Sequence, residues 1–253
     1  MTSGALTAPA HITDAPPAPS DIVRVYVWEA PVRIAHWLIA VSIVVLSATG
    51  FYIGYPLITV SGRAGEHFMM WWVKVIHGYT AYVFISAVLM RLIWMFTGNR
   101  YSHWDKFVPV HKARRRGLVP TLRFYLLAMR KPPGFVGHNP LAGLTYTLVF
   151  CLYFLSILTG LMLRGASSTS WVHWFAGWAP MLGGLQTVRW LHHVNMWLLL
   201  GFAVHHVYSS VLMSTVEANA TVESIFSGYK FVPREDLEYS GYRFINRRGQ
   251  VDE

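Results

Sequence analysis

The chain alternates between four long apolar runs and polar connections. The apolar runs cover residues 33–54, 69–96, 140–163 and 190–213. Each is long enough for an α-helix to cross a hydrocarbon core of about 30 Å, which takes about 20 residues. The whole chain is 54% hydrophobic and only 13% charged, which is too apolar for an ordinary soluble domain. The pattern predicts an all-α integral membrane protein, a bundle of four transmembrane helices.

Polar segments flank the predicted bundle on both sides. Residues 1–22 are rich in Ala, Pro, Ser and Thr and lack the basic start and apolar stretch of a signal peptide, so we expect a disordered tail. Residues 217–253 are polar and contain several Lys and Arg residues, so we expect a second tail. The predicted membrane domain is therefore 23–216.

Basic residues predict the orientation of the bundle. They crowd the connection at residues 99–139 and the C-terminal tail, while the other two connections contain few. Because cytoplasmic loops carry an excess of Lys and Arg, we expect the central connection and both termini to be cytoplasmic. The formal charge of +9 follows this pattern, so it indicates membrane topology and no nucleic-acid partner.

The fourth apolar run contains four histidines, two of which share a helix face. His192 and His206 are 14 positions apart. At about 100° per residue their side chains point within about 40° of each other. At about 1.5 Å per residue they lie about 21 Å apart along the helix axis. Ionisable groups at this depth are costly, so they indicate a functional site.

The predicted orientation matches these histidines in depth with two others. His77 lies about two turns into the inward-running second helix, so it lies with His192 towards the outside, and we call these two the outer pair. His36 begins the outward-running first helix, so it lies with His206 on the cytoplasmic side as the inner pair. Haem iron takes axial histidines from facing helices, which predicts two stacked haems. A lone intramembrane histidine is more often a hydrogen-bonded core residue, and that alternative remains open.

The haems would be of b type, bound without covalent attachment. The chain contains one cysteine, Cys151, and no Cys-x-x-Cys-His motif. Haem propionates are anionic and need cationic partners in a bundle of low dielectric. Arg91 is 14 positions after His77, which predicts the same face at the inner level. Lys74 and Arg189 are each three positions from an outer-pair histidine, although both could instead extend to the interface.

The remaining histidines are weaker candidates. We expect His193 and His205 to face away from the ligand face. The others are predicted to be surface or capping residues in the connections, with His67 as a weak alternative outer ligand: His67, His103, His111, His138 and His173. The third run contains no histidine and is predicted to serve in packing. Trp171, Trp174 and Trp178 are expected to be exposed, in the headgroup region or against a partner.

Several motifs resemble one known family, the cytochrome b subunits of membrane-bound nickel–iron uptake hydrogenases. EAPVRIAHWLIAVSIVVLSATGFYIG (29–54) and RWLHHVNMWLLLGFAVHHVY (189–208) are similar to its two signatures. Five shorter motifs also match: KVIH (74–77), LMRLIW (89–94), GNRYS (98–102), GHNPLA (137–142) and SGYK (227–230).

The resemblance implies a four-helix, bis-histidine protein with two haem b groups in the bacterial inner membrane. It implies an electron-transfer subunit that anchors a periplasmic nickel–iron hydrogenase, through its small and large subunits. Electrons from hydrogen would pass from the small subunit's iron–sulfur clusters to membrane quinone, with no catalysis of hydrogen oxidation by this chain. By position, His77 and His192 would hold the haem nearer the hydrogenase, and His36 and His206 the inner haem.

Other functions remain compatible with the sequence. The same haems would serve a formate dehydrogenase, a thiosulfate reductase or a free-standing b561-like cytochrome. A different class is a redox-silent membrane anchor or a metal transporter. No Asp or Glu lies within the four apolar runs, which argues against proton-coupled transport.

Overall fold

The computed structural model describes residues 22–56, 68–108, 110, 112–126, 135–234 and 236. Four helices in these residues are long and apolar enough to span a membrane: α1 (Ala30–Gly54), α2 (Met69–Thr97), α4 (Pro140–Gly165) and α6 (Leu185–Glu217). The predicted four-helix architecture is confirmed. The largest difference is α6, which begins five residues before the predicted run and ends four residues after it.

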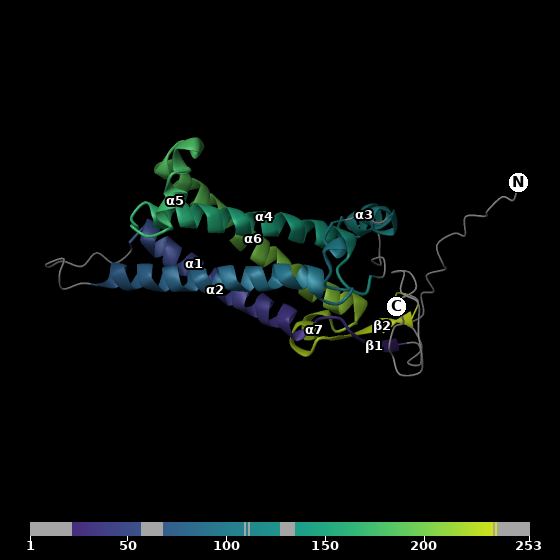
Figure 1. Cartoon of the computed structure of the whole chain (residues 1–253). Coiled ribbons are helices and arrows are strands. Elements are labelled where there is room, and N and C mark those ends of the chain that lie inside the picture. The colour runs from purple at the N-terminus through teal and green to yellow at the C-terminus, as the bar shows by residue number, and fades with distance from the viewer. Residues whose placement is uncertain are drawn as a thin grey trace, which may run out of the picture.

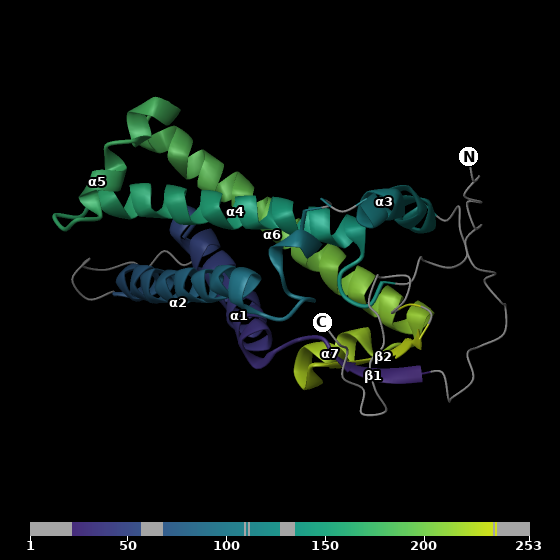
Figure 2. The same ribbon diagram turned by 45° about the vertical axis from the view of Figure 1, so that its right-hand side comes forward.

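The long helices are arranged as two pairs. α1 packs along α2 and α4 packs along α6, whereas contacts between the two pairs are much fewer. Figure 1 shows α2 and α4 running in nearly the same direction, with α1 and α6 crossing them obliquely, and Figure 2 shows the same arrangement from a second side. The most central contacts come from a buried apolar cluster that includes Ile39, Phe84, Tyr153 and Leu199, one or more from each helix. This cluster joins the two pairs at mid-height of the bundle.

The two ends of the bundle are built differently. At one end, here called the loop end, α5 (His173–Ala176) and the 3-10 turn η4 (Ala179–Leu182) connect α4 to α6. At the other, the sheet end, lie η3 (Trp104–Lys106), α3 (Lys112–Tyr125), α7 (Thr221–Ser227) and the strands β1 (Ile22–Tyr26) and β2 (Tyr229–Pro233).

A two-stranded antiparallel sheet joins the first and last described elements. β1 pairs with β2 from Ile22 opposite Pro233 to Tyr26 opposite Tyr229. The preceding turn requires Gly228, whose φ is +88° and where a Cβ would lie 2.5 Å from the Tyr26 ring. Its carbonyl accepts the backbone N–H groups of Val27 and Trp28. The pattern of hydrophobic residues predicted no structure for this part of the C-terminal tail.

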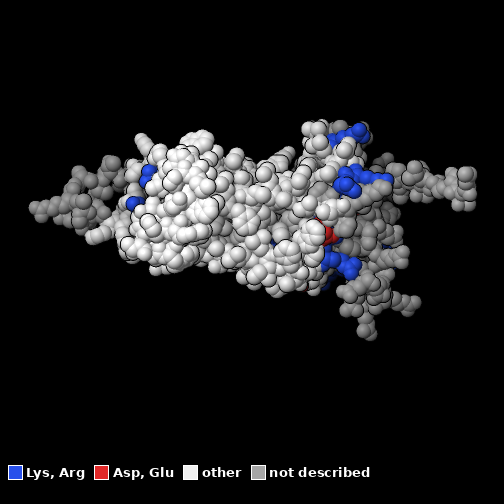
Figure 3. Space-filling view, turned by 45° about the horizontal axis from the view of Figure 1, so that its top comes forward, with Lys and Arg blue, Asp and Glu red and all other residues white. Residues whose placement is uncertain are grey.

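The lateral surface of the bundle is apolar. Val44, Ile93, Leu148 and Val204 are each more than half exposed. Figure 3 shows a broad uncharged surface in the middle of the molecule, with Lys and Arg gathered towards its two ends. Continuous exposed apolar surface of this size is characteristic of contact with lipid. The chain is therefore a multi-pass membrane protein.

Candidate functional site

The outer pair comes from two helices that belong to different helix pairs. His77 lies on α2 and His192 on α6, and the centroids of their rings are 6.5 Å apart with an angle of 63° between the ring planes. Both residues are partly buried. The structure thus brings together the two histidines that depth matching predicted as partners.

The inner pair has the same arrangement nearer the sheet end. His36 on α1 faces His206 on α6, with ring centroids 6.1 Å apart and an angle of 56° between the planes. Phe202 stacks on the His206 ring at 5.4 Å. The spacing of 14 residues on α6 therefore presents one imidazole to α2 and one to α1.

Both separations fit one metal ion between two imidazoles. A metal–nitrogen bond of about 2.0 Å, with the ring nitrogen about 1.1 Å from the centroid, places two opposed rings about 6.2 Å apart. Among the described residues no group of three or more His, Cys, Asp or Glu could hold a metal ion. Two facing histidines alone suit a metal whose other ligands come from a macrocycle, as in haem.

The outer imidazoles are oriented by hydroxyl groups of neighbouring helices. Thr49 Oγ1 on α1 lies 2.8 Å from His77 Nδ1, and Thr159 Oγ1 on α4 lies 2.8 Å from His192 Nδ1. The prediction that α4 serves in packing was incomplete, because a helix without histidines can still hold the ligands of its neighbour. A Thr-Gly sequence in both helices was the available signal.

The inner imidazoles have weaker polar contacts. His206 Nδ1 lies 3.4 Å from the Tyr146 hydroxyl, at the limit of a hydrogen bond. His36 Nδ1 is buried and has no hydrogen-bond partner among the described residues. Nitrogen atoms left free in this way are available to a ligand or to water, and each requires an explanation.

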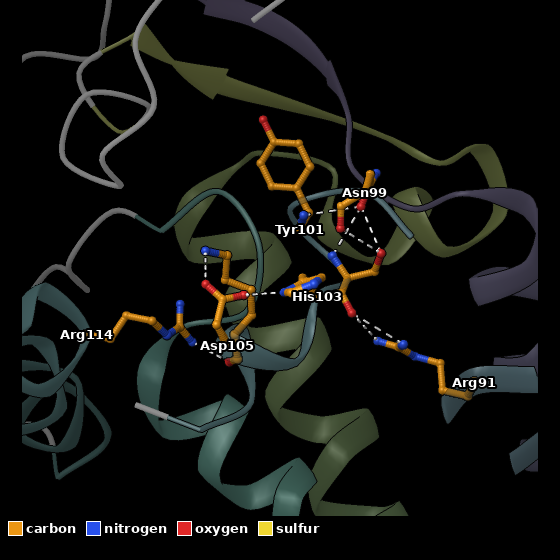
Figure 4. Close-up of polar contacts among 8 residues, drawn as sticks. Arg91, Asn99, Tyr101, His103, Asp105 and Arg114 are labelled. Atoms are coloured by element: carbon orange, nitrogen blue, oxygen red, sulfur yellow. Dashed lines mark hydrogen bonds and ion pairs between the residues drawn. The ribbon is translucent and has the colours of Figure 1, made fainter. Parts of the chain in front are cut away.

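The predicted cationic partners lie in two different environments. Arg91 is buried, 7% exposed, with its guanidinium 3.4 Å from the Ser102 carbonyl and 5.0 Å from the Phe107 ring centroid. Figure 4 shows this side chain reaching towards the loop that follows α2. Lys74 and Arg189 are exposed near the loop end, and Arg189 donates to Gln186 at 3.1 Å.

The loop beside Arg91 is held by one asparagine and one carboxylate. Asn99 Oδ1 accepts from the backbone N–H of Tyr101 and Ser102, at 3.2 and 3.1 Å (Figure 4). Glu29, at the start of α1, accepts from Trp94 Nε1 and from the Asn99 N–H. These bonds connect α1 to the end of α2 and explain why Asn and Ser occur in the GNRYS motif.

His138 corrects one expectation. It was predicted to be a surface or capping residue, but its ring is enclosed by the rings of Trp28, Phe107 and Tyr146, and its Nδ1 is buried. Burial, reinforced by the nearby positive charges of Arg91, Lys230 and Arg114, lowers the pKa of His138 well below 6.5. Sequence periodicity could not indicate this, because Trp28 comes from a distant part of the chain.

The other histidines lie outside the two pairs. His193 packs against Gly54 and Phe51 of α1, and His205 is exposed. His173 Nδ1 bonds the Gly165 carbonyl, and His103 bonds Asp105. His67 and His111 are outside the described residues. The predicted exposure of Trp171, Trp174 and Trp178 is confirmed, at 72%, 63% and 44%.

Four membrane-length helices with two tiers of facing histidines define a class, the membrane-bound b-type cytochromes. The chain belongs to the prokaryotic cytochrome b561 family, whose model matches residues 27–228. Haem b is therefore its cofactor.

Curated relatives confirm the resemblance of the sequence motifs. A protein of Cupriavidus necator is 38% identical over 83% of this chain and 88% of its own, and one of Bradyrhizobium diazoefficiens is 37% identical over 81% and 85%. Both are called "Probable Ni/Fe-hydrogenase B-type cytochrome subunit". A protein of Escherichia coli K12, 34% identical over 83% of this chain and 92% of its own, is called "Probable Ni/Fe-hydrogenase 1 B-type cytochrome subunit".

Proposed function

We propose that the chain is a di-haem membrane subunit that relays electrons from a periplasmic nickel–iron hydrogenase to membrane quinone. The observation that carries the proposal is the presence of two histidine pairs, at ring separations of 6.5 and 6.1 Å, on helices that cross the bilayer. Each separation suits one iron. Two cofactors in successive tiers provide a route for electrons through an otherwise insulating layer.

The haem supplies the redox chemistry, and the residues of the chain hold it and tune it. His77 and His192 are the axial ligands of the outer haem, and His36 and His206 those of the inner haem. Both pairs lie between helix pairs that contact each other only sparsely, so flat groups can be accommodated there. The apolar walls exclude water, which strengthens every electrostatic contact inside.

Cationic side chains neutralise the haem propionates. Arg91 serves the inner haem, since it is buried at the sheet end and its guanidinium donates to the Ser102 carbonyl rather than to a carboxylate of the described residues. Lys74 and Arg189 serve the outer haem from the exposed loop end, where each is one helical turn from an outer-pair ligand. The lower burial of these two residues suggests that they contribute less.

The sheet end faces the cytoplasm, and both termini lie on that side of a bacterial inner membrane. The support is the concentration of basic residues in α3 and the adjoining connection, compared with the sparsely charged loop end. The loop end then faces the periplasm. It exposes Trp171, Trp174 and Trp178 at the level where headgroups or a hydrogenase subunit would contact the chain.

Hydrogenase as the partner is supported by the names of the relatives and by the motifs shared with that family. Residues 1–22 and 217–253 would lie outside the haem-binding domain at 23–216, as tails, although α7 and β2 extend the folded part into the second. The small and large hydrogenase subunits would bind at the loop end. Quinone would take the electrons from the chain.

One spectroscopic measurement tests the proposal. The purified protein, reduced with dithionite, should show a low-spin b-type α-band and contain about two haems per chain by the pyridine haemochrome assay. Membranes containing the complex should show haem reduction when hydrogen is supplied. A protein without the band would be an anchor or a transporter. Reduction of the haems by formate but never by hydrogen, or reoxidation of the reduced haems by thiosulfate, would assign them to another oxidoreductase. A response to none of these substrates would indicate a free-standing cytochrome.

A further inference from the structure

The same dipeptide, Thr-Gly, occurs against each ligand of the outer pair. Thr49 and Gly50 lie on α1, which packs along α2, and Thr159 and Gly160 lie on α4, which packs along α6. Neither dipeptide is on the helix that carries the histidine it touches. α1 and α4 thus take equivalent positions towards His77 and His192.

The direction of the hydrogen bonds follows from the threonine hydroxyls. Thr49 Oγ1 donates its single proton to the Val45 carbonyl at 2.7 Å, and Thr159 Oγ1 donates to the Leu155 carbonyl at 2.6 Å. Each oxygen can then only accept from the ring nitrogen 2.8 Å away. Nδ1 of both histidines therefore carries the proton, and Nε2 keeps its lone pair for a metal.

The two glycines border the ring edges. A Cβ at Gly50 would lie 3.6 Å from His77 Cε1, and one at Gly160 would lie 3.4 Å from His192 Cε1. Both are ordinary van der Waals distances, so a methyl group would fit at either glycine. The threonine, which binds one ring nitrogen, is therefore the residue of each dipeptide that sets the direction of the ring.

We propose that Thr49 and Thr159 are positioning residues that set the tautomer of the outer pair and lower the reduction potential of the outer haem alone. This inference rests on the proposed haem ligands. An Nδ1–H that donates to a polarised hydroxyl makes the imidazole a stronger electron donor to iron, which favours the ferric state. The inner pair lacks this device, since the contact of His206 with Tyr146 is 3.4 Å and His36 Nδ1 is unpartnered among the described residues.

The two threonines should differ in how strongly each affects the reduction potential of the outer haem. Thr49 is only partly buried, so water can partly replace the hydroxyl lost from it. Thr159 is fully buried, so water cannot take the place of its hydroxyl.

The experiment is a redox titration of the purified full-length protein, with the outer haem identified as the one missing from a His77→Ala variant. Thr159→Val should raise the outer potential by about 59 mV, which corresponds to a tenfold change in the ratio of ferric to ferrous stability. Thr49→Val should raise it less. The Thr→Ser variants should restore the wild-type potential and the electron paramagnetic resonance spectrum. Thr147→Val is the matched control, because in the described part of the chain Thr147 bonds the Gly143 carbonyl of its own helix and no histidine.

The outcomes separate this inference from the proposed function. A wild-type protein with fewer than two haems overturns the proposed function, and this inference with it. With two haems present, an unchanged outer potential in Thr159→Val, or equal shifts of both haems, overturns the inference and leaves the proposed function intact. Loss of only the outer haem in Thr159→Val, reversed by Thr159→Ser, supports it.

Discussion

The two histidine pairs have nearly equal ring separations but different surroundings. The outer pair is held by hydroxyls from two helices that carry no ligand of that pair, and its nearby cations, Lys74 and Arg189, are exposed. The inner pair has one long contact to Tyr146, and its cation, Arg91, is buried. In the proposed di-haem arrangement, the protein would act on the two tiers by different means: hydrogen bonds to the ligands in one, and charge near the cofactor in the other.

The largest expected effect separates the tiers completely. His77→Ala should remove the outer haem and leave the inner haem spectroscopically intact, because the two tiers share no ligand. The pyridine haemochrome assay should fall from about two haems to about one per chain. His193→Ala is the control, since His193 neighbours a ligand in sequence but packs against Gly54. Retention of both haems in His77→Ala would show that the pairing is wrong.

A smaller effect is expected from the buried cation of the inner tier. Arg91→Gln should lower the inner haem potential by on the order of 59 mV, a tenfold change, because an uncompensated propionate favours the ferric state. Arg91→Lys should retain most of the wild-type value. In Arg189→Gln, an exposed site, the outer potential should change by clearly less, and a larger change there than in Arg91→Gln would contradict the comparison.

The sheet end should also respond to pH through His138. Its lowered pKa means that the unfolded chain binds a proton below about pH 6.5 while the folded protein does not, so stability falls as the pH falls. The slope for one group reaches at most about 1.4 kcal/mol per pH unit. Thermal unfolding in detergent at pH 7.5 and 5.5 should show a smaller difference for His138→Phe than for the wild type. Phe107→Leu, which disturbs the same packing, should lower the unfolding temperature by the same amount at pH 7.5 and at pH 5.5.

The smallest effect is expected at Tyr146. The Tyr146 hydroxyl lies 3.4 Å from His206 Nδ1, at the limit of a hydrogen bond. Tyr146→Phe should therefore change the equilibrium between the ferric and ferrous forms of the inner haem less than threefold. This is well below the change expected for the outer haem in Thr159→Val. The same redox titration measures both. Equal shifts of the haem potential in the two variants would show that hydrogen bonds to the ligands do not distinguish the outer pair from the inner pair.

Most of the bundle was predictable because its signals are local. A run of apolar residues predicts a membrane helix wherever it occurs, and all four expected helices are present. The ends of α6 were harder to predict, since polar residues such as Gln186 and Glu217 continue the helix beyond the apolar run. The β1–β2 pairing was not predicted, because neither five-residue strand shows a pattern that identifies its partner.

The sequence by itself determined the four membrane helices and the 14-residue spacing that puts His192 and His206 on one face of α6, because helical periodicity is a property of the chain alone. Only the tertiary structure decided which groups reach those rings. Thr49, Thr159, Tyr146 and the enclosure of His138 depend on how one helix packs against another. Such contacts join residues that are 28 to 60 positions or more apart, where no short-range pattern links them.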